Sequence, residues 1–313
     1  MSFERIKSRL LQGRPLVVAS DICASFRARG VTLDNPGAIG QLLRERPQEV
    51  LDHHRIEVES RVDVLTAMTA DTTPRALAEV GMQHRAAQLT SRAVELALEA
   101  AAESVKPVAV AGVLGSDMVS PVAADRLHEE LAEHAARLYA AGCELLITRG
   151  QGSRLNLMAA VVAAARTDLP AWAVVECTPA GDSQTGGPLS ELVEALHDAG
   201  ASAVLFEVPR VDIGLRELER FAISLEMSSL SPGVLLTASE SSLAGFNDPL
   251  SDPERWVDRA LDLSVAGARV IGGGAGTTEA HTRELARALG SLHPSLPATR
   301  SDTELDHEPN GDW

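Results

Sequence analysis

The sequence predicts an α/β protein with a single (β/α)8 barrel, the TIM-barrel architecture. Short apolar runs alternate with long Ala- and Leu-rich amphipathic segments along the chain. Each run is continuous rather than alternating, which is typical of parallel strands buried on both faces. Several runs follow a glycine that ends the preceding helical segment, as in "AAGCELLI", "DAGASAVLF" and "VAGARVIGG". These three observations together favour a barrel of parallel strands wrapped by helices.

Each element can be assigned in order. Strands are predicted at 15–20, 62–67, 107–112, 144–148, 171–176, 202–207, 233–238 and 268–273. Helices are predicted at 37–58, 74–103, 122–141, 155–166, 187–199, 211–228, 253–266 and 278–290. A doubly wound open sheet is the alternative, but no GxGxxG pattern follows the first strand. We predict that residues 1–290 form the barrel and that 291–313, rich in Pro, Asp, Glu and Ser, form a polar acidic tail.

Composition limits the classes of partner. The 313 residues include 44 Asp and Glu against 28 Lys and Arg, and the net charge of −16 argues against nucleic acid and anionic membranes as partners. The three cysteines form no CxxC pair and give no disulfide framework. The first residues lack an apolar signal-peptide core, and no apolar run reaches the roughly 18 residues that span a bilayer. We therefore expect a cytoplasmic protein.

Functional groups of such a barrel lie where strands end and loops begin. The positions selected by this rule are Ser20, Asp21, Met68, Thr69, Asp71, Gly112 to Ser116, Arg149, Gln151, Glu176, Cys177, Glu207, Ser239, Glu240 and Gly272 to Thr277. Glu176 and Glu207 end two apolar runs, "AWAVVE" and "SAVLFE", on neighbouring strands. We predict that these two carboxylates act as a general acid–base pair. Solvated loop carboxylates are the alternative interpretation.

Four fragments, in sequence order, resemble segments of the homocysteine S-methyltransferase family, which includes betaine–homocysteine methyltransferases and the homocysteine domain of cobalamin-dependent methionine synthase. They are "DVLTAMTADTTPRALAEVGM" (63–82), "VAVAGVLGS" (108–116), "AAGCELLITRGQGSRLNLMAAV" (140–161) and "VIGGGAGTTEAH" (270–281). Each fragment begins in or before a predicted strand and runs past its end. The resemblance covers nearly the whole chain and implies a barrel enzyme that transfers a methyl group.

The resemblance also implies a zinc ion held by three cysteine thiolates, one after strand six and an adjacent pair after strand eight. At these places the sequence has Val208, Gly274 and Ala275, none of which has a ligating side chain. We therefore expect no zinc, and we predict no other cofactor. A replacement metal site that joins Cys177 to Glu207 or Cys23 stays open, although cysteine is more often a small buried hydrophobe.

The implied substrate site is altered as well. Arg149 stands where the resemblance implies a glutamate that binds the amino group of homocysteine. A guanidinium suits a carboxylate, phosphate or sulfonate, so we predict a small anionic substrate rather than homocysteine. A rim ion pair of Arg149 with Glu144 or Glu176 is the alternative. The residues that we predict to bind substrate are Arg149, Asp21, Thr69, Asp71, Gly273 and Gly274.

The glycine-rich run "GGGAGTT" (272–278) gives a further possibility, an anion bound by backbone amides at the start of the next helix, with Thr277 or Thr278 as the cap. His281 follows one helical turn later and is the histidine expected nearest the barrel mouth. His134, inside a predicted helix, is expected on its outer face.

These observations leave three functions open. The first is a divergent, zinc-independent methyltransferase with an unidentified methyl donor. The second is a non-catalytic binding or partner subunit that keeps the barrel. The third is a barrel lyase or isomerase that uses Glu176, Glu207 and the glycine-rich run. At 313 residues the chain has no room for an added cobalamin or folate domain, so a donor would arrive free or on a separate methyl-carrier protein. A homo-oligomer is compatible with the sequence.

Overall fold

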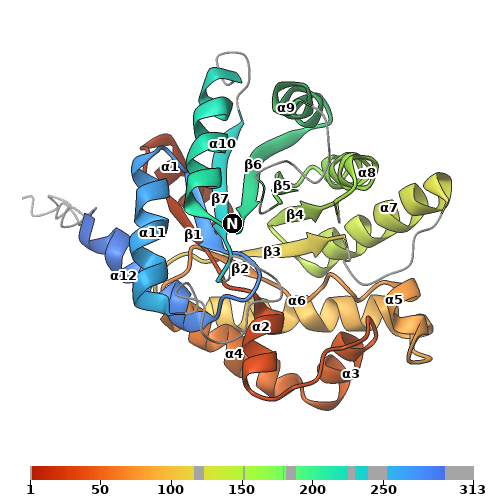
Figure 1. Ribbon diagram of the computed structural model, residues 1–313. Helices are drawn as coiled ribbons and strands as arrows, with labels where there is room; N and C mark the ends of the chain where they lie inside the picture. The colour runs from red at the N-terminus through yellow and green to blue at the C-terminus, as the bar shows by residue number, and fades with distance from the viewer. Residues whose placement is uncertain are drawn as a thin grey trace, which may run out of the picture.

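The computed structural model describes residues 2–115, 123–150, 152–178, 180, 188–224, 230–238 and 252–292. Eight parallel strands close into one barrel, and their spatial order is their order in the sequence (Figure 1). The strands are β1 (Leu16–Val18), β2 (Val64–Thr66), β3 (Ala109–Leu114), β4 (Leu145–Arg149), β5 (Ala171–Glu176), β6 (Ala201–Val208), β7 (Ser231–Leu236) and β8 (Val270–Gly273). The predicted (β/α)8 barrel is confirmed.

Helices form an outer layer around the strands (Figure 1). They are α1 (Ser2–Leu11), α2 (Ile22–Ala28), α3 (Ala38–Glu45), α4 (Pro47–Glu59), α5 (Pro74–Ala78), the 3-10 helix η1 (Gln83–Arg85), α6 (Ala86–Ala102), α7 (Ala124–Ala141), α8 (Arg154–Ala165), α9 (Leu189–Asp198), α10 (Val211–Ser224), α11 (Pro253–Val265) and α12 (Glu279–Leu292). Within the described ranges, no helix combines the length and the apolar character that a membrane crossing requires.

Two predicted helices are interrupted. The predicted helix 37–58 is divided into α3 and α4 at Arg46, because Pro47 has no N–H to continue a helix and is favourable in the first turn of a new one. The predicted helix 74–103 is divided near Gly81, whose φ of 71° is left-handed and ends the helical path. The helix α2 was not predicted, although Asp21 before it is a typical N-cap residue.

The helix α1 was not predicted either, and it closes the amino-terminal end of the barrel. Phe3 and Ile6 are buried among the side chains that point into the barrel, and the Phe3 ring lies edge-on to Trp172 with centroids 6.2 Å apart. The Glu144 carboxylate accepts hydrogen bonds from the backbone N–H groups of Ser2 at 2.6 Å and Phe3 at 3.4 Å. Because side chains of α1 cover the barrel interior at this end, the barrel opens at the carboxyl-terminal ends of the strands.

The barrel continues past the predicted boundary at residue 290, because α12 ends at Leu292. Residues 293–313, which make up most of the predicted acidic tail, lie outside the described residues. The same holds for four residues selected at strand ends, namely Ser116, Gln151, Ser239 and Glu240.

Candidate active site

A cavity of about 190 Å3 opens at the carboxyl-terminal ends of the strands. The predicted site residues that line it are Asp21, Thr69, Arg149, Glu207, Gly273 and Gly274. Glu176 and Asp71, also predicted, are not among the lining residues. Much of the remaining wall is apolar and includes Met68, Ile147 and Leu235. A small, mostly apolar cavity with a few charged groups at one end is the usual form of a small-molecule site.

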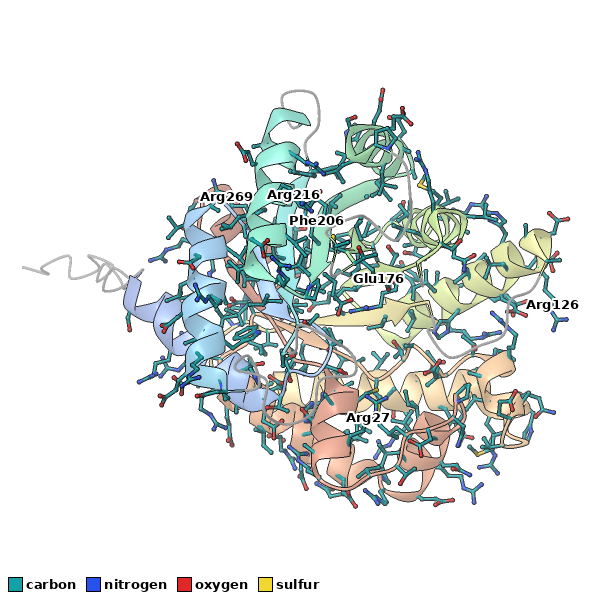
Figure 2. The ribbon with its side chains drawn as sticks, viewed as in Figure 1. Arg27, Arg126, Glu176, Phe206, Arg216 and Arg269 are labelled. Atoms are coloured by element: carbon teal, nitrogen blue, oxygen red, sulfur yellow. The ribbon has the colours of Figure 1, made fainter. Side chains whose placement is uncertain are left out.

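Arg149, the last residue of β4, is bound by two carboxylates. Its Nη1 donates a hydrogen bond to Glu207 Oε2 at 2.6 Å and lies 3.8 Å from Glu176 Oε1. The three side chains are 21%, 10% and 14% exposed, so water screens their charges only partly. Figure 2 shows Glu176 inside the ring of outer helices. The alternative partner Glu144 lies at the other end of β4, where it binds α1.

The alternation of side chains along β6 decides which residue faces the cavity. Leu205 belongs to the barrel interior, whereas Phe206 packs against Phe221 of α10 with ring centroids 5.9 Å apart. Glu207 therefore faces inward, and Val208 faces the helices and is fully buried there. Position 208, where the resemblance implies a ligand, thus faces away from the cavity, and Glu207 is the side chain of β6 that lines it.

The loop after β8 uses its backbone amides within the chain. Gly274 N donates to Leu236 O at 2.9 Å, Ala275 N to Glu207 Oε1 at 2.9 Å, Gly276 N to Asp21 Oδ2 at 3.1 Å, Thr277 N to Gly274 O at 3.2 Å and Thr278 N to His281 Nδ1 at 3.0 Å. An anion that bound these amides would have to displace two carboxylates and three other acceptors. The backbone amides of this loop therefore do not form a ready binding site for an anion.

Gly274 allows the close approach of Glu207 to the loop after β8. A Cβ at position 274 would lie 3.0 Å from Glu207 Oε1 and 3.1 Å from the backbone oxygen of Leu235. The space into which a side chain at this position would extend is thus occupied by the carboxylate. A side chain at position 274 would require Glu207 and the backbone near Leu235 to shift from their present positions.

Asp21 joins the end of β1 to the same loop. Its Oδ1 accepts from Cys23 N at 3.0 Å and so caps α2, while its Oδ2 accepts from Gly276 N at 3.1 Å. The backbone N–H of Asp21 donates to Thr277 Oγ1 at 3.2 Å. Asp21 therefore has a structural role in addition to lining the cavity.

Thr69 and Asp71 differ in their relation to the cavity. Thr69 lines it, but its Oγ1 accepts a hydrogen bond from Val113 N at 2.8 Å and so joins the loop after β2 to β3. Asp71 is buried away from the cavity. His134, whose ring lies 3.1 Å from Thr69 O, is fully buried rather than on an outer face, and burial lowers its pKa to about 4. The imidazole is therefore a neutral support for the cavity wall.

Sequence reasoning missed Glu57, a fully buried carboxyl group of α4. It accepts hydrogen bonds from Ser20 N at 3.2 Å and from Ser20 Oγ, and Ser20 lines the cavity. Burial raises the pKa of Glu57 to about 7, although the hydrogen bonds from Ser20 act in the opposite direction. A signal existed in the sequence, because Val50, His54 and Glu57 share the buried face of one helix.

The structure does not assemble the replacement metal site considered from the sequence. Cys177 packs in the layer between strands and helices, and burial raises its pKa to about 12. His281 is buried against the Trp256 ring, with centroids 5.4 Å apart, and does not line the cavity. Across the described ranges, no three His, Cys, Asp or Glu side chains come together as metal ligands would.

Comparison with known proteins supports the resemblance seen in the sequence. The family model described as Homocysteine S-methyltransferase matches residues 20–289. The homocysteine methyltransferase MmuM from Escherichia coli is similar at 19% identity over 88% of this chain and 96% of that chain, with TM-scores of 0.72 for its metallated form and 0.74 for its oxidized form. A dihydrodipicolinate synthase from Agrobacterium tumefaciens is similar at 15% identity, with a TM-score of 0.54 over 90% of this chain and 77% of that chain.

At these identities the solved structures show a shared fold and no more. The family model carries the assignment, because it extends from the end of β1 to α12 and so includes nearly the whole barrel. The chain belongs to the homocysteine S-methyltransferase family.

Proposed function

We propose that this protein is a methyltransferase-type enzyme that works without a thiolate-bound zinc ion and acts on a small substrate other than homocysteine. The observation that supports this most strongly is the Arg149–Glu207 ion pair. The Glu207 carboxylate occupies the space beside Gly274, and its other oxygen accepts from the Ala275 amide. A metal ion at this place would meet a guanidinium instead of thiolates, so the residues present do not fit zinc.

The proposed substrate carries an anionic group that binds the guanidinium of Arg149. Glu207 and Glu176 already face this guanidinium, so an anion alone would enter a cluster that is negative overall. A substrate that also presents a cationic or hydrogen-bond-donating group to Glu207 or Asp21 offsets that repulsion. We therefore narrow the proposal to a small molecule that has both kinds of group and places its anionic group at Arg149, where the resemblance implies that homocysteine would place its ammonium group.

The two predicted catalytic carboxylates take different roles in this proposal. Glu207 lines the cavity and is proposed to accept the proton of the nucleophile that receives the methyl group. Glu176 does not line the cavity, and we propose that it positions Arg149 from 3.8 Å away. The lyase or isomerase alternative relied on an anion cradle in the glycine-rich loop and loses that support.

Calorimetric titration with small zwitterions, dicarboxylates, phosphorylated metabolites and homocysteine tests the proposed substrate class. We expect a zwitterionic or anionic ligand whose affinity falls roughly tenfold or more in Arg149→Ala and less in Arg149→Lys. Arg55→Ala is the control, because Arg55 pairs with Glu103 on the outer surface, 2.6 Å away. Tight binding of homocysteine that Arg149→Ala leaves intact would contradict the proposal.

Ligands found in this way can distinguish an enzyme from a binding subunit. Each ligand is incubated with the protein and a series of methyl donors, and the products are followed by mass spectrometry. Methylation that depends on Glu207 supports the enzyme. Binding without turnover under every donor tested would favour the non-catalytic alternative.

Metal content gives an independent test. We expect the chain, purified from zinc-supplemented cells, to contain far less than one zinc per molecule by elemental analysis, because the ligand set is absent from the described site. Stoichiometric zinc that is lost in Cys177→Ala and Glu207→Ala would restore the replacement metal site and overturn this part of the proposal.

A further inference from the structure

A second cavity, of about 270 Å3, lies at the amino-terminal end of the barrel, opposite the candidate active site. Five basic side chains line it, namely Arg5, Arg9, Arg14, Arg61 and Lys106. Asp63 is the one acidic residue in its wall. The chain as a whole has 44 acidic and 28 basic residues, so this basic cavity is opposite in sign to the molecule that contains it.

The fold itself uses Asp63 and Arg9. Asp63 is 6% exposed, accepts a hydrogen bond from Val17 N at 2.9 Å and forms an ion pair with Arg9. This contact joins α1 to the sheet and compensates the charge of Arg9. In the part of the chain that the structure describes, Arg5, Arg61 and Lys106 form no ion pair with a carboxylate. Three of the five basic side chains therefore line the cavity without a carboxylate at ion-pair distance among the described residues.

The backbone conformation at Arg61 is a second indication that the basic cavity has a role beyond the fold. Arg61 lies in the turn between α4 and β2 and has a φ of 67°, the left-handed region that favours glycine. Glycine would relieve this strain, and no fold requirement for the arginine side chain is visible among its contacts. Strain kept at the wall of a cavity is a recognised mark of a functional position.

We propose that the basic cavity binds a small phosphate-bearing molecule with two or more negative charges. Guanidinium groups bind phosphate oxygens in pairs, and an anion of this kind relieves the mutual repulsion of the cations around it. A volume of about 270 Å3 suits pyrophosphate or a phosphorylated metabolite. The excess negative charge elsewhere disfavours a nucleic acid, which would extend beyond the cavity. The site is separate from the one used in the proposed function.

The ligand would connect elements that meet at this end of the barrel. Arg5 and Arg9 belong to α1, Arg61 precedes β2 and Lys106 precedes β3. Binding should therefore hold α1 against the strands and raise the melting temperature of the whole chain.

Thermal unfolding and calorimetry with sodium pyrophosphate test the proposal on the full chain, with NaCl at matched ionic strength as the reference. We expect pyrophosphate to raise the melting temperature and to bind with an affinity that falls roughly tenfold or more in Arg61→Gly. This variant removes the charge and also relieves the backbone strain, so loss of binding would not reflect misfolding. The double variant Arg5→Ala, Lys106→Ala should lose binding in the same way.

Two control variants locate the binding. Arg92→Ala removes an exposed arginine of α6 that pairs with Glu95, and Arg149→Ala alters the candidate active site; both should bind pyrophosphate as the wild-type chain does. Loss of binding in Arg149→Ala but not in Arg61→Gly would assign the anion to the other cavity and overturn the proposal. Failure of pyrophosphate to exceed NaCl would overturn it as well.

Two further outcomes would replace the proposed ligand. Tighter binding of a single-stranded oligonucleotide, lost in Arg61→Gly, would identify a nucleic acid instead. Pyrophosphate binding that is seen only after residues 293–313 are removed would identify that acidic segment as the occupant. Either result would overturn the assignment to a small molecule.

Discussion

Residues buried in α4 carry ionisable groups whose pKa values the fold moves in opposite directions. Burial raises the pKa of Glu57 to about 7, and it lowers the pKa of His53 to about 4 and of His54 to about 3. In each case desolvation favours the neutral form. The carboxyl of Glu57 contacts Ser20 in the cavity wall, so its charge is relevant both to stability and to the shape of the site.

The raised pKa of Glu57 predicts a stability that falls as pH rises. The folded protein holds the proton of Glu57 more tightly than the unfolded chain does. The contribution of protonated Glu57 to the free energy of unfolding is therefore complete below pH 4.5 and is lost as pH rises through about 7. The shift corresponds to about 3 kcal/mol. We expect the free energy of unfolding in urea to fall between these pH values by about this much more in the wild-type chain than in Glu57→Gln.

The comparison with Glu57→Gln is needed because other groups titrate in the same range. The depressed pKa values of His53, His54 and His134 give stability that is lost as pH falls, which is the opposite trend. These groups are present in both proteins and cancel in the difference. Parallel pH profiles for the two proteins would show that Glu57 does not titrate as stated.

At the scale of elements, the loop after β8 is held between two carboxylates that come from distant strands. Asp21 follows β1 and accepts from Gly276 N, while Glu207 ends β6 and accepts from Ala275 N. Glu207 also binds Arg149 at the end of β4. The loop is thus part of a hydrogen-bonded network around the mouth, and its hydrogen bonds to Asp21 and Glu207 fix its conformation.

This network predicts a larger loss of stability for Asp21→Ala than for an ordinary helix cap. Asp21 caps α2 and also accepts from Gly276 N, whereas Thr73 caps α5 through Ala76 N alone. Removing a cap costs about 1 kcal/mol, and losing a second hydrogen bond of the ordinary kind costs about 0.5 to 1.5 kcal/mol. We expect chemical denaturation to show the larger loss for Asp21→Ala. Equal losses in Asp21→Ala and Thr73→Ala would mean that the loop does not depend on Asp21.

For the whole molecule, the decisive feature is closure of the barrel between its first and last strands. β1 pairs with β8 through Leu16 with Val270 and Val18 with Gly272. The closed barrel has a candidate active site at one end and the basic cavity at the other, with α1 at the amino-terminal end. The packed side chains inside the barrel therefore separate the candidate active site from the basic cavity.

Closure predicts that Gly272 cannot accept a side chain. A Cβ there would lie 2.7 Å from Val18 Cβ and 3.0 Å from Val18 O, and the backbone oxygen has no room to move. We expect Gly272→Val to lower the free energy of unfolding by about 2 kcal/mol or more. Gly290→Ala is the control, since nothing lies within 4 Å of a Cβ there, and in α12 it should add about 0.5 to 1 kcal/mol. Similar stability of the two variants would argue against tight closure.

The sequence predicted the barrel because its signals are local. Apolar runs, glycines at helix ends and motifs at strand ends can each be recognised within a few residues, and all eight predicted strands overlap the observed ones. It missed α1, whose Phe3 and Ile6 pack among side chains of distant strands, and α2, whose Phe26 packs against His53 of α4. The rule for strand ends selected eleven of the residues that line the cavity, and six of them were predicted as site residues.

The sequence by itself determined the fold class, the family and the absence of cysteine at positions 208, 274 and 275. Only the tertiary structure decided which side chains meet at the end of the cavity near positions 208, 274 and 275. The alternation of β6 turns Glu207 toward the cavity, and the closed barrel brings it to Arg149 of β4 and to Ala275 beyond β8. The closed barrel also places Glu57 of α4 beside Ser20. At its opposite end it gathers basic residues from α1 and from the segments before β1, β2 and β3. Such charges and burial depend on residues far apart in the chain, and no local pattern encodes them.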